Sequence, residues 1–356
     1  MTDIADFDPN GAATGDGIFG LPHGRDNAKI HLLPVPFDAT TSYGGGASKG
    51  PDAIMDASMQ VDLYDHSFGS VWKAGIFMDD APDGVSDLSV KARGAALPII
   101  EMGGVDPDHS GEHAHALQVV NDASEQVQML VRTWTGQALR DGNIPGIIGG
   151  DHSTPLGAIE AAAAHLATSG KTGLGILQID AHMDLRPAFE GFAQSHASIM
   201  HNVMEHVPTI GRLVQVGIRD SCEQEREYAK SQGKAISVWH DQDIANAVAD
   251  GATLRSIMQK IVADLSEHVW ISFDIDGLDP SLCPGTGTPV PGGLSFREMT
   301  LLLKTLAASG KQVVGFDLVE VCPTYDDNEW NANVGARVLY KLCGIAATTH
   351  NLIPKV

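Results

Sequence analysis

Three segments of the sequence place imidazoles or carboxylates directly after a short apolar run. Each run has the length and the near-continuous apolar character of a buried parallel strand. In open α/β sheets ligands bind at the carboxyl ends of the strands, so the three segments are predicted to meet at one edge of a sheet. The six polar residues that they supply are His152, Asp180, His182, Asp184, Asp274 and Asp276.

The chemistry of these six side chains predicts a pair of divalent metal ions. A single zinc ion usually takes four ligands with Cys or His well represented, and Mg²⁺ and Ca²⁺ prefer oxygen alone. Six mixed nitrogen and oxygen ligands suit two ions of the Mn²⁺ type, and Asp180 and Asp274 could bridge them. Four carboxylates gathered without cations would repel one another strongly, and no nearby run of Lys or Arg offsets them.

Short apolar runs alternate with stretches of helical period along most of the chain, which indicates a parallel sheet with right-handed crossovers. The predicted strands are Ile30–Val35, Ala74–Met78, Pro145–Ile148, Leu174–Ile179, Leu213–Ile218, Ala235–Trp239, Val269–Phe273 and Val313–Val319. The predicted helices are Asp122–Leu139, Pro155–Ala167, Gln224–Gln232, Leu254–Ser266, Phe296–Ala308 and Asn333–Thr349.

Two segments interrupt this rhythm. Residues 1–28 are rich in Asp and Gly, and we expect a surface arm. The polar stretch around residues 78–124 is expected to be an insertion rather than a domain. No Pro/Ser-rich linker divides the remainder, so residues 29–356 are predicted to form a single catalytic domain.

Composition narrows the class of protein. The chain of 356 residues has 23 Lys and Arg against 45 Asp and Glu, a net charge of −22. Such a charge argues against nucleic acid or an anionic membrane as a partner and suits a small cationic substrate. The chain has no apolar run of membrane-spanning length and no secretory signal. Its four dispersed cysteines suit reduced thiols, so a cytoplasmic location is expected.

At this point the sequence resembles a known family. Gly149-Gly-Asp-His-Ser153, Asp180-Ala-His-Met-Asp184 and the segment Ser272–Pro280 occur in the order found in the ureohydrolases, the arginases and agmatinases. The resemblance covers about residues 29–350. It implies a three-layer α/β/α sandwich with a mostly parallel eight-stranded sheet. It also implies two divalent metal ions per chain, with Mn²⁺ expected and Ni²⁺ as the alternative. The implied reaction hydrolyses a guanidino C–N bond to urea plus an amine or ammonia, in a trimer or hexamer.

The same resemblance implies roles for individual residues. One metal would take His152, Asp180, Asp184 and Asp274, and the other Asp180, His182, Asp274 and Asp276, with a hydroxide between them. Two metals lower the pKa of a shared water enough to make a nucleophile at neutral pH. Asp184 would also carry a proton to the leaving nitrogen, His196 would shuttle protons, and Glu320 would pair with the substrate guanidinium.

The segment between Asp184 and His196 departs from the family. Arginases carry polar residues there that hold the amino-acid head group, whereas this chain has Phe189 and Phe192, with Arg186 as almost the only donor. We expect both phenylalanines to narrow the pocket. The expected substrate is therefore free guanidine, agmatine or another short guanidino compound without the arginine head group. Hydrolysis of L-arginine or of a guanidino acid is the alternative.

Other interpretations stay open at this stage. A non-catalytic regulatory relative would be free to lose these ligands, and a zinc deacetylase on a related fold would need only one metal. The family's Gly and Pro after the shuttle His are absent, so Ser198 is expected to cap a helix that reaches about Val207. Four further expectations concern single features: a solvated loop around His109, His113 and His115, a turn shaped by Asp279, a packed Cys322 thiol, and a loop with Trp330 that helps close the site.

Overall fold

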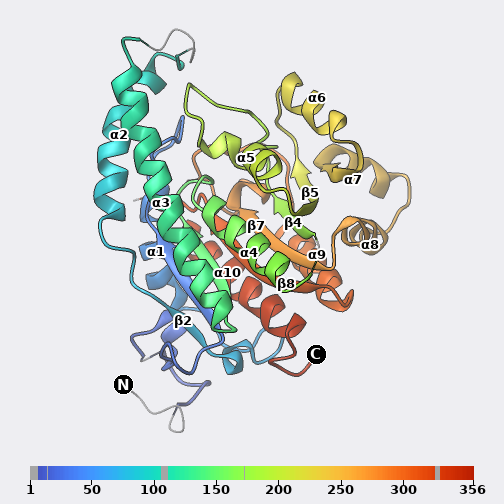
Figure 1. The fold of residues 1–356 in the computed structure, drawn as a ribbon. Coiled ribbons are helices and arrows are strands. Elements are labelled where there is room, and N and C mark those ends of the chain that lie inside the picture. The colour runs from blue at the N-terminus through green and yellow to red at the C-terminus, as the bar shows by residue number, and fades with distance from the viewer. Residues whose placement is uncertain (1–6, 14, 106–110, 172, 325–328) are drawn as a thin grey trace.

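The computed structural model describes residues 7–13, 15–105, 111–171, 173–324 and 329–356. Eight strands within these residues form one sheet in the order β2-β1-β3-β8-β7-β4-β5-β6, and every neighbouring pair is parallel (Figure 1). The strands are β1 (Ile30–Val35), β2 (Ile76–Met78), β3 (Ile144–Gly149), β4 (Leu174–Ile179), β5 (Ile210–Ile218), β6 (Ile236–His240), β7 (His268–Asp274) and β8 (Gln312–Val319).

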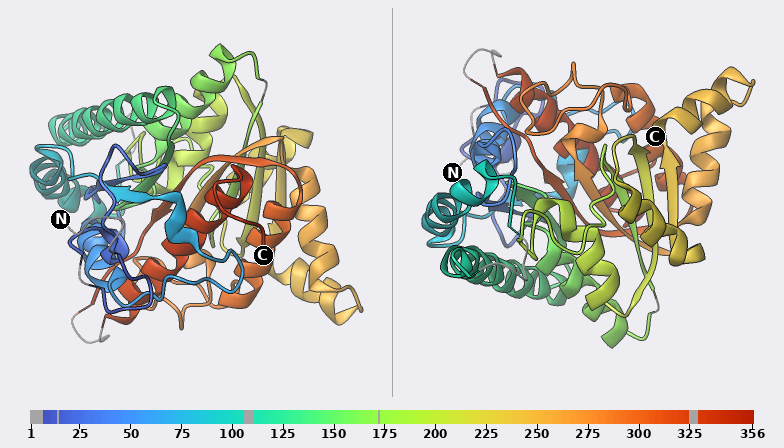
Figure 2. Two further views of the ribbon diagram at one scale, coloured as in Figure 1. Left: turned by 90° about the horizontal axis from the view of Figure 1, so that it is seen from below. Right: turned by 90° about the horizontal axis from the view of Figure 1, so that it is seen from above.

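Helices cover both faces of the sheet, so the predicted three-layer sandwich is confirmed (Figures 1 and 2). One layer contains α3 and α4, with α2 packed against α3, and the other contains α1, α8, α9 and α10. The helices are α1 (Gly50–Ser58), α2 (Val85–Glu101), α3 (Ala114–Arg140), α4 (Leu156–Thr168), α5 (Ile199–His206), α6 (Glu223–Ser231), α7 (Asp241–Ala249), α8 (Leu254–Asp264), α9 (Phe296–Ala308) and α10 (Trp330–Thr349).

The apolar strands separate two hydrophobic cores. Successive side chains of a strand point to opposite faces, and Leu32 accordingly packs in the core that includes α10 while Leu33 packs in the core beside α4. Likewise, Ile148 packs in the core that includes α10, and Ile147 packs in the core beside α4. This burial on both faces explains why the strands read as continuous apolar runs. Polar side chains gather instead at the carboxyl ends of the strands.

The N-terminal segment differs from the predicted surface arm. Ile18, Phe19 and Leu21 are each 1% exposed. The ring of Phe19 lies edge-on to Tyr340 of α10, with 4.8 Å between the ring centroids. Ile18, Phe19 and Leu21 therefore pack into the core. The prediction missed them because Asp and Gly dominate the composition of residues 1–28.

The expected polar insertion is built largely of helix. Helix α3 begins at Ala114, eight residues before the predicted start, and α2 was not predicted. The buried positions of α2 are 85, 89, 92, 96 and 99, which is a helical period carried partly by small residues. Helices α1 and α7 were also missed. Among the described residues, no helix is long and apolar enough to span a membrane.

Candidate metal centre and active site

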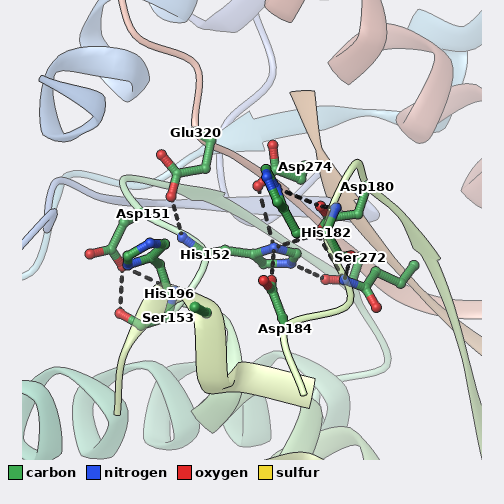
Figure 3. Close-up of polar contacts among 12 residues, drawn as sticks. Asp151, His152, Ser153, Asp180, His182, Asp184, His196, Ser272, Asp274 and Glu320 are labelled. Atoms are coloured by element: carbon green, nitrogen blue, oxygen red, sulfur yellow. Dashed lines mark hydrogen bonds and ion pairs between the residues drawn. The ribbon is translucent and has the colours of Figure 1, made fainter. Parts of the chain in front are cut away.

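Four adjacent central strands deliver the candidate residues to one edge of the sheet. His152 follows β3, Glu320 follows β8, Asp274 ends β7, and Asp180 follows β4. Because all four strands run in the same direction, their ends meet at one place, and Figure 3 shows these side chains facing one another. The prediction that separate strands meet at one polar edge is confirmed.

The first cluster surrounds the imidazole of His152. Its Nδ1 atom lies 3.0 Å from Asp180 Oδ2, 2.9 Å from Asp184 Oδ2 and 3.4 Å from Asp274 Oδ2 (Figure 3). His152, Asp180 and Asp184 are all buried and arranged so that they could hold one ion. These four residues are those that the family resemblance assigned to one metal.

The second cluster shares Asp180 with the first. His182 Nδ1 lies 3.0 Å from Asp276 Oδ2 and 3.6 Å from Asp180 Oδ1. Asp180, His182 and Asp276 form the second group that could hold an ion. The two oxygens of the Asp180 carboxylate therefore face different clusters, as a bridging ligand requires.

Hydrogen bonding within the first cluster fits a metal ion. His152 Nε2 lies 2.9 Å from the Ser272 hydroxyl, which donates to Asp317 Oδ1 at 3.0 Å. The opposite ring nitrogen, Nδ1, is buried and faces the carboxylates of Asp180, Asp184 and Asp274. Ligating histidines commonly fix one ring nitrogen through such a partner and offer the other to the metal.

The charges in the site point the same way. Burial, and then the neighbouring Asp180, raises the pKa of Asp184 to about 7. Burial, and then Asp276, raises the pKa of Asp274 well above its ordinary value. Buried carboxylates this close together need cations to stay ionised, so the donor set fits two divalent ions.

Backbone geometry at the site explains part of the sequence pattern. A Cβ atom on Gly150 would lie 2.0 Å from the carbonyl oxygen of Phe37, so only glycine fits in the turn before His152. Asp184 and Glu320 have φ values of 54° and 60°. Such left-handed conformations are uncommon outside glycine and cluster at functional sites.

One carboxylate oxygen of Glu320 has no hydrogen-bond partner among the described residues. Its Oε1 accepts a hydrogen bond of 3.0 Å from the backbone N–H of His152, and its Oε2 is buried without a hydrogen bond in the described structure. Burial, and then Asp274, raises the pKa of Glu320 well above its ordinary value. A cation with N–H donors that entered the pocket would satisfy this oxygen.

His196 is held by Thr40, a residue that was not predicted to belong to the site. The Thr40 hydroxyl accepts a hydrogen bond of 3.1 Å from the backbone N–H of His196, and it lies 3.4 Å from the Nδ1 atom of the His196 ring. The same hydroxyl donates to Asp151 Oδ2 at 3.2 Å. Burial, and then His182, lowers the pKa of His196 to about 3. The imidazole is therefore neutral at neutral pH. Thr40 lies 156 positions from His196, so local spacing carried no signal for this contact.

One cavity of about 540 Å³ joins these groups to the surface. Phe189 lines it, and the Arg186 guanidinium stacks on that ring with 4.6 Å between Cζ and the ring centroid. Phe192 is 1% exposed and packs in a core beside α2 and α3, so the expectation that it walls the pocket is wrong. The described lining residues include Ser42, Tyr43, His152, His182, Asp184, Arg186, Phe189, His196, Asp220, Ser221, Glu225, Asp274, Thr288, Val290 and Glu320.

Two smaller expectations near the pocket hold. Asp279 accepts hydrogen bonds from the backbone and hydroxyl of Ser281, so it shapes a turn. Cys322 is 5% exposed, and its thiol donates to the Gly45 carbonyl oxygen at 3.7 Å.

Other expectations need correction or fall outside the described residues. Trp330 begins α10 and donates to the carbonyl oxygen of Ser281, and it is absent from the described pocket lining. Helix α5 follows Ser198, but the Ser198 side chain forms no cap bond within the described residues, and the Ser195 hydroxyl instead accepts from the Ala197 N–H. His109 lies outside the described residues, and neither metal-capable group found in those residues includes His113 or His115.

Comparison with known proteins identifies the family. The sequence pattern of the group described as the arginase family matches residues 28–344. The chain belongs to the arginase family. Hydrolysis of carbon–nitrogen bonds in linear amidines is the chemistry of this family, and the protein is a hydrolase of that class.

Relatives of this arginase-family chain match along most of its length. An N(1)-aminopropylagmatine ureohydrolase of Thermus thermophilus is 31% identical over 323 residues, covering 90% of this chain and 91% of the relative. A proclavaminate amidinohydrolase of Streptomyces clavuligerus is 30% identical over 329 residues, covering 90% and 89%. The solved agmatine ureohydrolase of Thermoplasma volcanium shares the fold, with a TM-score of 0.69 at 24% identity and coverage of 94% and 96%.

Proposed function

We propose that this arginase-family hydrolase uses two divalent metal ions to hydrolyse free guanidine or a short guanidino compound such as agmatine, releasing urea. The observation that carries the proposal is the pair of His/Asp clusters that share Asp180. When bound there, the two ions would supply a water of lowered pKa at neutral pH. His152, Asp180, Asp184 and Asp274 would hold one ion, and Asp180, His182, Asp274 and Asp276 the other.

Glu320 would bind and orient the substrate. Glu320 lines the same cavity as the two clusters, and its Oε2 atom forms no hydrogen bond within the described residues. A guanidinium is planar and cationic, and a carboxylate accepts its N–H donors with matching geometry. This contact would hold the guanidinium carbon beside the metal ligand Asp274, which lines the cavity too.

Asp184 and His196 would handle protons. Asp184 lines the cavity beside His152, where its carboxyl would be placed to carry a proton to the leaving nitrogen. His196 lines the same cavity, so its imidazole would be placed to pass a proton between the leaving group and solvent. The leaving group would depart as ammonia from guanidine or as an amine from a substituted guanidine.

The charge of the pocket wall supports a substrate without a carboxylate. Beyond the metal ligands, the described part of the lining carries the acidic side chains Asp220, Glu225 and Glu320 and one fixed cation, Arg186. The Arg186 Nε atom lies 3.7 Å from Glu225 Oε2, and its guanidinium stacks on Phe189. Arg186 is thus already in contact with Glu225 and Phe189, so a substrate carboxylate would have to compete with Glu225 for its guanidinium.

A guanidino acid is the second candidate, because Arg186 is one-third exposed and could exchange Glu225 for a substrate carboxylate. The variant Arg186→Gln separates the two candidates. It should abolish activity on 4-guanidinobutyrate if that is the substrate, and it should leave hydrolysis of free guanidine within about threefold if the first proposal is right.

The metal and the assembly are further parts of the proposal. Mixed imidazole and carboxylate ligands suit Mn²⁺, and Ni²⁺ also accepts imidazole. The family resemblance suggests a trimer or hexamer, which light scattering on the purified protein would measure.

The test is urea release from guanidine, agmatine, 4-guanidinobutyrate, guanidinoacetate and L-arginine, with protein loaded separately with Mn²⁺ and Ni²⁺. Urea from guanidine or agmatine is the expected result. L-arginine turned over about tenfold better than both would overturn the substrate proposal. Two bound metals without urea from any compound would favour a non-catalytic relative.

A further inference from the structure

Two glutamines interrupt the apolar interior of the sheet behind the metal clusters. Gln178 of β4 and Gln215 of β5 are paired in the sheet register, and both are 0% exposed. Burying an amide is costly unless its hydrogen bonds are satisfied. Their position therefore calls for an explanation beyond packing.

The hydrogen bonds of this glutamine pair lead to a metal ligand. Gln215 Nε2 donates to Gln178 Oε1 at 2.6 Å and to the Met183 carbonyl oxygen at 2.7 Å. Gln178 Nε2 donates to Asp180 Oδ2 at 2.7 Å and to the His182 carbonyl oxygen at 3.3 Å. The pair thus contacts the loop 180–184 at three points, and this loop supplies three of the six candidate ligands.

The surroundings fix the direction of both amides. If the Gln215 amide turned over, its oxygen would face the Met183 carbonyl and Gln178 Oε1, which are both acceptors. If the Gln178 amide turned over, its oxygen would face the Asp180 carboxylate. Only the observed orientation avoids these contacts, so Gln215 obliges Gln178 to direct its N–H₂ group at Asp180.

We propose that the glutamine pair positions the loop 180–184 for metal binding, with Gln215 acting through Gln178 on the bridging carboxylate of Asp180. The inference rests on the metal centre of the proposed function. Neither glutamine would touch an ion, so both are positioning residues. Groups that orient metal ligands in this way commonly change metal affinity 10- to 100-fold when they are removed.

The test measures Mn²⁺ affinity by titration calorimetry on metal-free protein, with no substrate present. Gln178→Met and Gln215→Met keep the side-chain length and remove the hydrogen bonds, and each should weaken Mn²⁺ binding about tenfold or more. Gln128→Met is the control. Gln128 is also buried, at 3% exposed, and bonds to the backbone of Ser153 and Gly157, outside the pair. The control should bind Mn²⁺ within about twofold of wild type.

A fourth variant tests the direction of the hydrogen bonds. Gln215→Glu keeps the shape but replaces the donor by a carboxylate, so Gln178 should turn its N–H₂ group away from Asp180. Its Mn²⁺ affinity should fall below that of Gln215→Met. If Gln215→Met does not fold, the Mn²⁺ affinity of Gln215→Glu tests the role of Gln215 in its place.

Thermal unfolding separates positioning from simple structural support. Both Gln215→Met and Gln128→Met are expected to lower the Tm of metal-free protein. Only Gln215→Met should shrink the rise in Tm that saturating Mn²⁺ produces in wild type. The inference would be overturned if Gln215→Met and Gln178→Met bound Mn²⁺ as tightly as wild type does. It would also be overturned if Gln128→Met lost as much Mn²⁺ affinity as these two variants. Because no turnover is measured, absence of urea release would contradict the proposed reaction and leave this test intact.

Discussion

The backbone N–H of His152 donates a hydrogen bond of 3.0 Å to Oε1 of Glu320, and the other carboxylate oxygen of Glu320 is buried with no hydrogen-bond partner in the part of the chain that the structure describes. This contact links the end of β3, which carries a candidate metal ligand, to the end of β8, which carries the candidate substrate carboxylate. The backbone N–H of Glu320 also donates to the carbonyl oxygen of Gly150 at 2.8 Å, so hydrogen bonds between these two strand ends hold the metal centre and the proposed cation site side by side.

Replacing that carboxylate by an amide should impair substrate binding. Glu320→Gln keeps the shape but loses the charge that would pair with a guanidinium. A hydrogen bond to a charged group contributes about 1.5–3 kcal/mol, so kcat/KM for the active guanidino substrate should fall about 10- to 100-fold. Asp220→Asn, at an exposed residue of the pocket rim, is the control and should stay within about threefold. An unchanged kcat/KM in Glu320→Gln would contradict the assigned role.

Removing the Thr40 hydroxyl should release His196. Thr40→Val breaks the bonds to the His196 backbone and to Asp151, and kcat should fall about tenfold because a misplaced proton-transfer group loses part of its contribution. Thr40→Ser should restore most of the activity. Thr41 is also buried, and its hydroxyl forms no hydrogen bond in the described structure. Steady-state kinetics of Thr41→Val should therefore match wild type, and an equal loss in both valine variants would refute the assignment.

His196 should make the folded protein less stable in acid. Its pKa is lowered to about 3 in the fold, against about 6.5 for an unfolded imidazole. Between these values the unfolded state binds more protons, so the free energy of unfolding rises with pH in this window and is lost as pH falls through it. Urea denaturation of metal-free protein should thus show a weaker loss between pH 6.5 and pH 5 in His196→Asn than in wild type.

The exposed His206 on α5 provides the matched variant for that experiment. His206→Asn should retain the wild-type slope of stability against pH over the same interval. Parallel slopes for wild type and His196→Asn would show that the imidazole of His196 does not stay neutral in the fold.

Replacing Phe189 or Phe192, which both lie between Asp184 and His196, by alanine should give different phenotypes. Phe192 is fully buried, and Phe192→Ala should cost about 3–5 kcal/mol of unfolding free energy. Phe189 lines the cavity and supports Arg186, so Phe189→Ala should cost less. It should raise the ratio of kcat/KM for agmatine to that for guanidine about tenfold, because the wall is opened for the longer substrate. Equal stability losses with no change in this ratio would argue against a wall role for Phe189.

The metal ligands could be predicted because their signals are local. Each ligand follows an apolar strand within a few residues, and the parallel direction of the strands brings the ends together. Thr40 and the glutamine pair gave no such signal. Gln215 lies 37 positions from Gln178, and its role depends on β4 and β5 being neighbours in register.

The helices and the substrate loop were less predictable for different reasons. Helix α2 buries Ser89, Ala92 and Ala96, and small residues weaken the apolar period on which the prediction relies. Phe189 and Phe192 occupy similar positions in the sequence, but a tight turn with positive φ at Glu190 and Gly191 separates their surroundings. No spacing rule distinguishes the ring that enters the core from the ring that lines the cavity.

The most direct test of the account is the number of metal ions bound per chain. Wild-type protein saturated with Mn²⁺ and freed of excess metal should contain two ions per chain by inductively coupled plasma mass spectrometry. Asp276→Asn, which removes a carboxylate that belongs to the group around His182 and not to the group around His152, should contain one. A single ion per saturated wild-type chain, unchanged in Asp276→Asn, would contradict the binuclear centre on which the proposed reaction depends.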